Sequence, residues 1–296
     1  MNILIVKLSP FHELFNAVPT VHLLKEYYNA KISWVVHEYY NDLVKLFDDV
    51  DNIILYPENE LKHSNRKKFR IDLHQIYYDL VIDLEGSMES ALICKSSRKN
   101  LKTRIFGPSF QREGAFKLYD VICGNRNIDR PNYIQCMDVL KYLKIPCNNV
   151  QYNLDSSNFK HPVNNDSYIL ICTESKHAKK NLPIEVCKKI ISKSNEKVLI
   201  ISNKNNSFSY DELEFTYSDK KVEILEKKIS IFKKIELIYY SKKMICCNYD
   251  DLQIASALGL DGLMINMENK SNYSSTCNKI LEIISLDTAK KIDFVY

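Results

Sequence analysis

The N-terminal stretch Ile3-Leu4-Ile5-Val6-Lys7-Leu8-Ser9-Pro10-Phe11-His12-Glu13 decides the fold class of the chain. Its first four residues form a short apolar run typical of a buried strand, and from Leu14 the apolar residues recur with the spacing of a helix. A strand, a loop and a helix in this order open an α/β domain. In such domains ligands bind at the carboxyl ends of the strands, so we expect Glu13 to point into a functional crevice.

The rest of the chain alternates in the same way. Strands are predicted at 31–36, 52–56, 79–84 and 103–106, with helices at 15–28, 68–77 and 133–143. The pattern is lost between 147 and 166. It restarts with strands at 168–172, 197–202, 243–247 and 262–266 and helices at 183–194, 231–240, 251–258 and 277–284. Alternating strands and helices predict parallel, doubly wound sheets. We therefore expect two Rossmann-like domains, 1–158 and 159–296, with a site in a central cleft.

Composition excludes several classes of protein. The formal net charge of +4 is small, and the basic surplus is spread along the chain, so no nucleic-acid partner is predicted. The nine cysteines include no C-x-x-C pair and no secretory signal precedes them, which predicts reduced thiols in a cytosolic protein. No apolar run approaches the roughly 20 residues of a membrane span. The chain has six glycines, and none of them lies in the loop directly after the first strand, which excludes the dinucleotide fingerprint and the P-loop.

Four stretches resemble a known family. In that family, a strand and a lysine are followed by a Gly-Asp pair and, six residues on, by a proline. The opening of this chain, from Met1 through Glu13 to Pro19, is similar to that pattern. Residues 78–86 with Ser90-Ala91 resemble a second shared stretch, and 111–113 a weaker third. Lys180-Asn181-Leu182-Pro183 is similar to a Lys-x-Trp-Pro motif. The family is glycosyltransferase family nine, the bacterial heptosyltransferases that add heptose to the lipopolysaccharide inner core.

The resemblance implies the GT-B fold, with the acceptor on the N-terminal domain and the nucleotide sugar on the C-terminal domain. It implies an inverting glycosyltransferase with an ADP-heptose-type donor and a lipopolysaccharide core or related glycolipid as acceptor. Such an enzyme would be cytoplasmic, peripheral at the inner face of the inner membrane, and monomeric. Since no Asp-x-Asp motif precedes the expected sugar-nucleotide pocket and no Cys/His cluster has ligand spacing, no metal or other cofactor is expected.

Glu13 stands where the family has the aspartate of its Gly-Asp pair. The resemblance implies that Glu13 is the general base that takes the proton from the acceptor hydroxyl. Glutamate is one methylene longer than aspartate, which displaces the carboxylate by up to about 1.5 Å. The alternative is structural, because a negative charge in the first turn of a helix is stabilised by the helix dipole.

The implied donor-binding residues come from the C-terminal half. Lys180 would contact the diphosphate, although a solvated basic loop is the alternative, and Ile229 would lie against the base unless it is simple core. The turn at 248–253 replaces the Asp-Thr-Gly-x-x-His of the family at a helix start, where free N–H groups receive phosphate. Its acids, Asp250 and Asp251, are better explained as helix caps. The full predicted set is Ser175, Lys180, Ile229, Asn248, Tyr249, Asp250 and Gln253.

The implied acceptor-binding residues are Arg66, Arg70 and Arg112. The first two belong to a basic run at 62–70, and a second run without acids spans 95–104. Such runs fit an anionic glycolipid and an anionic membrane, or are ordinary solvated surface.

Because the departures from the family fall on its chemical motifs, a second function stays open. In it, the chain is a catalytically degenerate GT-B protein that binds or assembles other enzymes of envelope glycan synthesis. A third possibility is transfer from a different nucleotide sugar.

Overall fold

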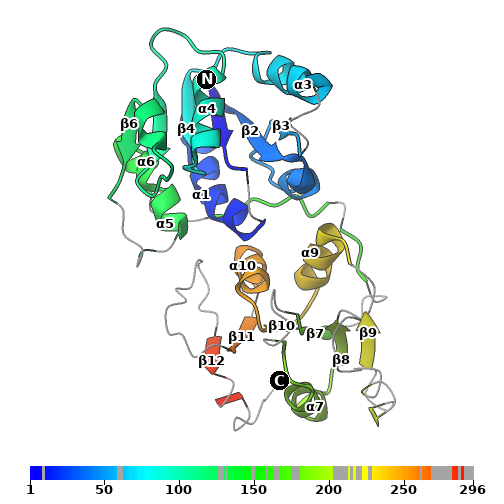
Figure 1. Cartoon of the computed structure of the whole chain (residues 1–296). Coiled ribbons are helices and arrows are strands. Elements are labelled where there is room, and N and C mark those ends of the chain that lie inside the picture. The colour runs from blue at the N-terminus through cyan, green and yellow to red at the C-terminus, as the bar shows by residue number, and fades with distance from the viewer. Residues whose placement is uncertain are drawn as a thin grey trace. The chain divides into compact units, whose positions relative to one another are not determined.

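The computed structural model describes residues 1–8, 11–58, 63–125, 130, 132–147, 151–157, 159–162, 167–174, 181–202, 213, 216, 217, 222–225, 229–260, 262–267, 282–285, 288 and 289. The chain divides into two compact units, Met1–Ser157 and Asn158–Tyr296. This division differs by one residue from the one expected at 158. Each unit contains its own sheet, and each is described by itself (Figure 1).

The sheet of the first unit has six parallel strands in the order β3-β2-β1-β4-β5-β6. The strands are β1 (Asn2–Val6), β2 (Lys31–His37), β3 (Asn52–Tyr56), β4 (Leu80–Asp83), β5 (Ile105–Pro108) and β6 (Val121–Cys123). The helices are α1 (Phe11–Tyr28), α2 (Asn41–Val44), α3 (His63–Leu73), α4 (Met88–Ser96), α5 (Asn132–Cys136) and α6 (Asp138–Tyr142), with single 3-10 turns at Glu38–Tyr40 and Ala115–Leu118.

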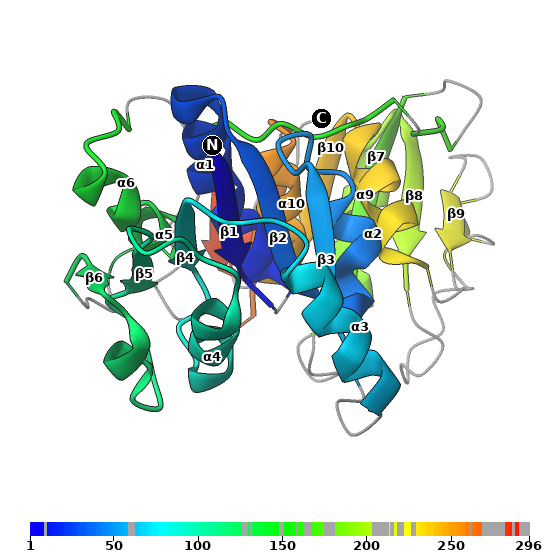
Figure 2. The ribbon, with the colours of Figure 1, turned by 90° about the horizontal axis from the view of Figure 1, so that it is seen from above.

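Helices cover both faces of this sheet. In Figure 2, α3 and α4 lie on one side of the strands, and α1 and α6 lie on the other. Phe69 and Leu73 of α3 and Ile93 of α4 pack in one buried cluster with Leu4 and Val6 of β1. Because both faces are covered, the central strand β1 is apolar and buried from Ile3 to Val6 rather than alternating, as the opening run of the sequence predicted.

The second unit repeats this topology. Its six parallel strands follow the order β12-β11-β10-β7-β8-β9. The strands are β7 (Tyr168–Cys172), β8 (Lys197–Ile201), β9 (Val222–Leu225), β10 (Lys243–Cys246), β11 (Gly262–Asn266) and β12 (Glu282–Ser285), and the described helices of four or more residues are α7 (Ile184–Lys193), α9 (Ile231–Tyr239) and α10 (Tyr249–Ala257). Val186 and Ile190 of α7 pack against Ile169 and Ile200 of the sheet.

The chain forms the strands of the two sheets in the same order. In each, the chain moves outward from the first strand through two more and then returns to the other side of the first strand. The strand order therefore reverses between β1 and β4 and between β7 and β10. In open parallel sheets, ligands bind at the carboxyl ends of the strands at this reversal. The predicted α/β class, with two Rossmann-like doubly wound sheets, is confirmed.

Several predicted elements are corrected. Residues 282–284, expected to end a helix, form part of β12, and residues 277–281 lie outside the described part of the chain. The helix expected at 133–143 is divided at Met137 into α5 and α6, although Met137 N still donates to Tyr133 O at 3.0 Å, as in a continuous helix. The strand expected at 103–106 lies at Ile105–Pro108.

Candidate functional site

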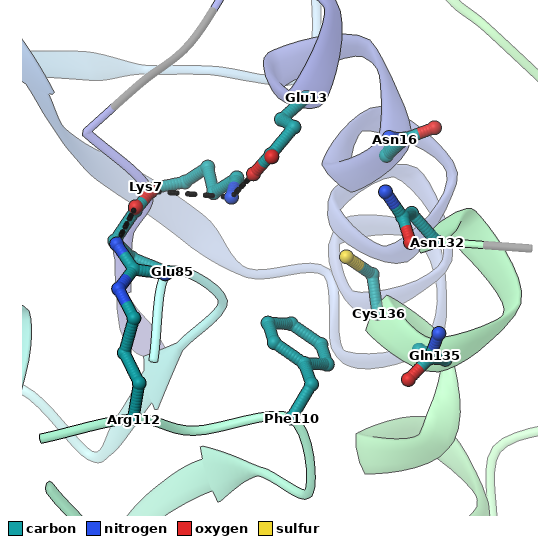
Figure 3. Close-up of a pocket in the computed structure, with 9 residues that line it drawn as sticks. All are labelled: Lys7, Glu13, Asn16, Glu85, Phe110, Arg112, Asn132, Gln135 and Cys136. Carbon is teal, nitrogen blue, oxygen red and sulfur yellow. Dashed lines mark hydrogen bonds and ion pairs between the residues drawn. The ribbon is translucent and has the colours of Figure 1, made fainter. Parts of the chain in front are cut away.

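A pocket of about 250 Å³ lies at the carboxyl ends of β1, β4 and β5, where the strand order of the first sheet reverses (Figure 3). Three sections of chain supply one wall, namely the end of β1, the loop after β4 and the loop after β5. The first turns of α1 and helix α5 supply the other. The lining residues are Lys7, Glu13, Asn16, Glu85, Phe110, Arg112, Asn132, Gln135 and Cys136.

Lys7 lies at the centre of the charged part of the pocket. Its side chain is only 2% exposed, and its Nζ lies 2.5 Å from Glu13 Oε2 and 3.1 Å from Glu85 Oε2. Burial by itself lowers the pKa of Lys7, but attraction to Glu13 and Glu85 outweighs burial, and the pKa is raised above the usual value for lysine. Lys7 is therefore an ammonium ion, not a base.

Asp83, the last residue of β4, shapes the loop that carries Glu85. The amides of Glu85 and Gly86 donate to Asp83 Oδ1 at 2.8 and 2.9 Å, and the hydroxyls of Ser90 and Tyr119 donate to Oδ2 at 2.7 and 2.8 Å. Burial nevertheless raises the pKa of Asp83, against the effect of these four donors. The loop is a closed turn around one carboxylate, which fixes the direction of Glu85.

The same turn starts α4 and receives Arg112. Ser87 caps α4 by accepting from the amide of Ser90, and the hydroxyl of Ser90 accepts from the amide of Ser87. Gly86 has φ +77, and a Cβ there would lie 3.0 Å from Pro108 and 3.1 Å from the backbone of Gln111, so the loop after β5 packs directly on it. The amide of Arg112 donates to Gly86 O at 2.8 Å.

Arg112 adds a second cation at the mouth of the pocket. Its Nη2 donates to Glu85 Oε1 at 3.0 Å, and its Nε lies 3.7 Å from Glu113. The side chain is 53% exposed, which leaves it accessible to a ligand. Glu85 therefore binds Lys7 with one oxygen and Arg112 with the other. A chain of alternating charges runs from Glu13 through Lys7 and Glu85 to Arg112, as Figure 3 shows.

Glu13 lies in the first turn of α1, as both of its predicted roles require. Its side chain is 31% exposed and lines the pocket, so the carboxylate is open to a ligand as well as to Lys7. The predicted residues Glu13 and Arg112 are thus brought into one pocket. Sequence reasoning missed Lys7 and Glu85, although both occur in the quoted stretches. A charged residue that follows an apolar strand is the sequence signal that could have identified both.

The remaining wall consists of polar amides, one aromatic ring and one thiol. Asn16 and Asn132 face Phe110 across the pocket, and the amide nitrogen of Gln135 donates to Arg130 O at 2.9 Å. Burial raises the pKa of Cys136 to about 12, with Glu13 and Glu85 adding to the shift and Lys7 opposing it. Cys136 is therefore a neutral thiol and a weak nucleophile. No signal in the sequence placed α5 beside α1.

The reversal point of the second sheet carries the predicted donor turn. Asn248 follows β10 and caps α10, since its Oδ1 accepts from the amide of Asp251 at 2.8 Å. Its Nδ2 donates to Glu174 O, after β7, at 2.7 Å and to Asp251 Oδ2 at 2.8 Å. The N-cap is therefore Asn248 and not, as was expected, one of the two acids. Asp251 lies in the first turn of α10 and is 2% exposed, with Lys234 Nζ at 2.6 Å. Lys234, on α9, was not predicted.

The other predicted site residues have mixed outcomes. Ser175 and Lys180 lie outside the described residues. Tyr249 and Asp250 are half-buried in the first turn of α10, and Gln253 is buried in the same helix. Ile229 is half-buried next to Ser230, the N-cap of α9. Arg66 and Arg70 are exposed on α3.

Two kinds of feature are absent from the described part of the chain. Among its residues, no group of three or more His, Cys, Asp or Glu side chains could hold a metal ion. None of its helices is long and apolar enough to cross a membrane.

The comparisons with known proteins give a fold. No family model matches the sequence, and no curated protein matches it. Among solved structures, E. coli heptosyltransferase WaaC with ADP has a TM-score of 0.77 and 16% identity, covering 100% of this chain and 96% of that one. A glycosyl transferase of family 9 from Veillonella parvula has a TM-score of 0.74 and 11% identity, covering 96% and 85% of the two chains.

The third similar structure is E. coli ADP-heptose lps heptosyltransferase II, with a TM-score of 0.72 and 15% identity, covering 96% of this chain and 90% of that one. At such identities the likeness shows the fold alone. The resemblance to family nine that the sequence suggested is confirmed at this level. The chain has the fold of these heptosyltransferases along nearly its whole length.

Proposed function

We propose that the chain is an inverting, metal-independent glycosyltransferase of the heptosyltransferase type, with Glu13 as general base. The observation that carries this proposal is a partly exposed carboxylate in a pocket at the reversal point of the first sheet. A positioned carboxylate in hydrogen-bond reach of a hydroxyl can accept its proton. The fold shared with three glycosyltransferases supports the same reaction class.

In the proposed reaction, an acceptor hydroxyl enters the pocket and transfers its proton to Glu13 as its oxygen attacks the anomeric carbon of the donor. The new carbon–oxygen bond forms as the bond between the anomeric carbon and the diphosphate oxygen breaks, so the configuration inverts. A nucleoside diphosphate leaves with the bonding electrons. Glu13 then releases the proton to solvent, which restores the carboxylate.

The pocket suits one sugar unit of an acceptor. Its volume of about 250 Å³ lies below the usual range for drug-sized ligands, which is consistent with a single ring. The amides of Asn16 and Asn132 can bind hydroxyls, and Phe110 offers an apolar face. Arg112 can pair with a carboxylate or phosphate. We propose that the acceptor is an anionic glycolipid of the lipopolysaccharide core type, with Arg66 and Arg70 as further contacts at the inner membrane face.

We place the donor at the reversal point of the second sheet. Asn248, Tyr249, Asp250 and Gln253 belong to the turn and helix that start there, and Ile229, Ser175 and Lys180 complete the proposed donor set. One similar structure is heptosyltransferase WaaC with ADP, and another is an ADP-heptose lps heptosyltransferase. An ADP-heptose-type donor is therefore our first choice for this chain.

The test is the variant Glu13→Gln, which keeps the size of the side chain and removes its basicity. Turnover should fall by about 10²- to 10⁴-fold, while donor affinity stays the same. Glu26→Gln, an exposed glutamate near the other end of α1, is the matched control and should leave turnover unchanged. If Glu13→Gln has full turnover, Glu13 is structural.

A second function is favoured by one observation. Asp250 and Asp251 lie in the first turn of α10, where a diphosphate would otherwise meet free N–H groups. A degenerate GT-B protein that binds or assembles envelope enzymes does not have to hold a diphosphate at this helix start, so these acids would not impair it. A panel of nucleotides and nucleotide sugars separates the two functions. Bound at a hundred times its dissociation constant, a ligand adds about 2.7 kcal/mol of stability. A melting temperature that no nucleotide raises would favour the binding protein.

A further inference from the structure

Lys7 is buried in a way that needs an explanation. Long charged side chains are almost never fully buried unless they are paired. Trp34 Nε1 donates to Lys7 O at 3.0 Å, and the next amide, that of Leu8, donates to Glu85 Oε2 at 3.3 Å. These two hydrogen bonds fix the backbone of Leu8 and of Lys7, from which the ammonium group extends. Such a fixed cation is suited to holding another side chain in place.

Two carboxylates flank this cation from different elements. Glu13 approaches from the first turn of α1 with Oε2 at 2.5 Å, and Glu85 approaches from the loop after β4 with Oε2 at 3.1 Å. Within the described residues, the Glu13 side chain makes its only hydrogen bond through Oε2 to Lys7. Among the same residues no donor contacts its other oxygen, Oε1, and the side chain lines the pocket.

We propose that Lys7 is a positioning residue for Glu13, and that Glu85 is the second counter-charge that keeps Lys7 in place while Glu13 gains and loses a proton. This inference rests on the proposed function, because it takes Glu13 to be the base.

The first part of the inference follows from geometry. Glutamate has one more rotatable bond than aspartate, so a free Glu13 would sample several positions and lose entropy on becoming ordered. Binding Oε2 to a fixed ammonium group leaves the carboxylate one orientation, with Oε1 available to the acceptor hydroxyl. A misplacement of about 1 Å at such a group can cost about 10²-fold in rate.

The second part follows from charge. When Glu13 takes the proton its negative charge disappears, and a buried ammonium ion without a partner is costly. The charged groups that face Lys7 and Glu13 are Glu85 and Arg112, since Cys136 on α5 is a neutral thiol. Glu85 Oε2, 3.1 Å from Lys7 Nζ, is a second partner that stays beside the ammonium group when Glu13 takes the proton. Without it, Lys7 would depend on Glu13 alone and would oppose its protonation.

The inference is tested with Lys7→Met, Glu13→Gln and the double variant in the full chain. Lys7→Met should lower kcat by about 10- to 100-fold with the donor KM unchanged. In the Glu13→Gln background the same change should alter kcat less than about threefold, because the group that Lys7 positions is already inactive. A loss by the same factor in both backgrounds would mean general structural damage and would overturn the inference.

Further variants complete the design. Lys25→Met removes a lysine–carboxylate pair at the other end of α1 and should leave kcat unchanged. Glu85→Gln should lower kcat in the wild-type background and have little effect in the Glu13→Gln background. It serves in place of Lys7→Met if that variant does not fold. An unchanged kcat in Glu85→Gln would refute the role of the second counter-charge.

A wild type without transfer from any donor would refute the proposed function and, with it, the catalytic part of this inference. The link between Lys7 and Glu13 would still be measured by melting temperature. If the two side chains act as a unit, the double variant loses less than the sum of the two single losses. Strictly additive losses would show that the two side chains do not act together.

Discussion

Gly107 in β5 gives the sharpest test of how the pocket loop is held. A Cβ at this position would lie 2.0 Å from Cδ2 of the Tyr119 ring, whereas ordinary contacts begin at 3.4 Å. In Gly107→Ala the ring must therefore move by about 1.4 Å. The Tyr119 hydroxyl, which donates to Asp83 Oδ2 at 2.8 Å, would then lie beyond hydrogen-bond reach. The turn that directs Glu85 loses one of its four donors.

The expected cost has two parts. Overpacking in a filled core costs about 1 to 3 kcal/mol, and a lost hydrogen bond to a charged group costs about 1.5 to 3 kcal/mol. The free energy of unfolding of the first unit should thus fall by about 2.5 to 6 kcal/mol. For a unit of this size, that loss lowers the melting temperature by about 5 to 24 °C.

Trp34 provides the assay, because it is the single tryptophan and is buried in β2, so its fluorescence reports the unfolding of the first unit alone. Gly114→Ala is the matched control. Gly114 has φ +79 but no atom closer than 3.8 Å to a new Cβ, so only backbone strain of about 1 to 2 kcal/mol is expected. Adding Tyr119→Ala to Gly107→Ala should recover part of the loss. A Gly107→Ala protein that unfolds within about 0.5 kcal/mol of the wild type would refute the reasoning.

Two further predictions concern charge. Lys234→Met leaves the buried Asp251 without its cation and should cost about 3 to 5 kcal/mol, whereas Lys242→Met, at the exposed pair with Glu196, should cost under about 1 kcal/mol in urea unfolding followed by circular dichroism. Burial lowers the pKa of Lys234, but Asp251 outweighs burial and the pKa is raised. The stabilisation is therefore complete below pH 10.5 and lost as pH rises through the raised pKa, so the difference between wild type and variant should narrow above pH 10.5; a constant difference would contradict this origin. Arg66→Glu with Arg70→Glu should weaken binding to vesicles containing an anionic glycolipid and flatten its salt dependence, with nucleotide binding intact. Unaltered vesicle binding would identify these residues as solvated surface.

The fold class was predictable because its strands are buried on both faces and read as apolar runs. The predicted bounds of β3 and β11 match the structure, and those of β7 do as well. The strands that were missed, β6, β9 and β12, have only three or four residues each and lie at or near sheet edges. Such short segments give too little periodicity to identify.

Helix α4 was also missed, because the residues that start it are not the usual signal. Its start is marked by Ser87 and Ser90, which complete a capping box, but the usual signal has Glu or Gln as the second partner. At the site, Glu13 could be predicted from the sequence because it lies just after the loop that follows β1. The neighbours of Glu13 depend on register, since Val6 lies beside Asp83 and thereby brings Lys7 next to Glu85. A pairing between residues about 78 positions apart cannot be inferred from one sequence without the sheet order.

Because each six-stranded sheet is built from an unbroken section of the chain, the order of synthesis matters for how the protein acquires its structure. The unit that carries Glu13 and Lys7 is complete once Ser157 has been added, before the first strand of the other sheet exists. Ribosomes add about 5 to 20 residues per second, and domains generally fold as units with the N-terminal one first. The first sheet can thus form all of its own strand pairs on the ribosome before the strands of the second sheet are synthesised.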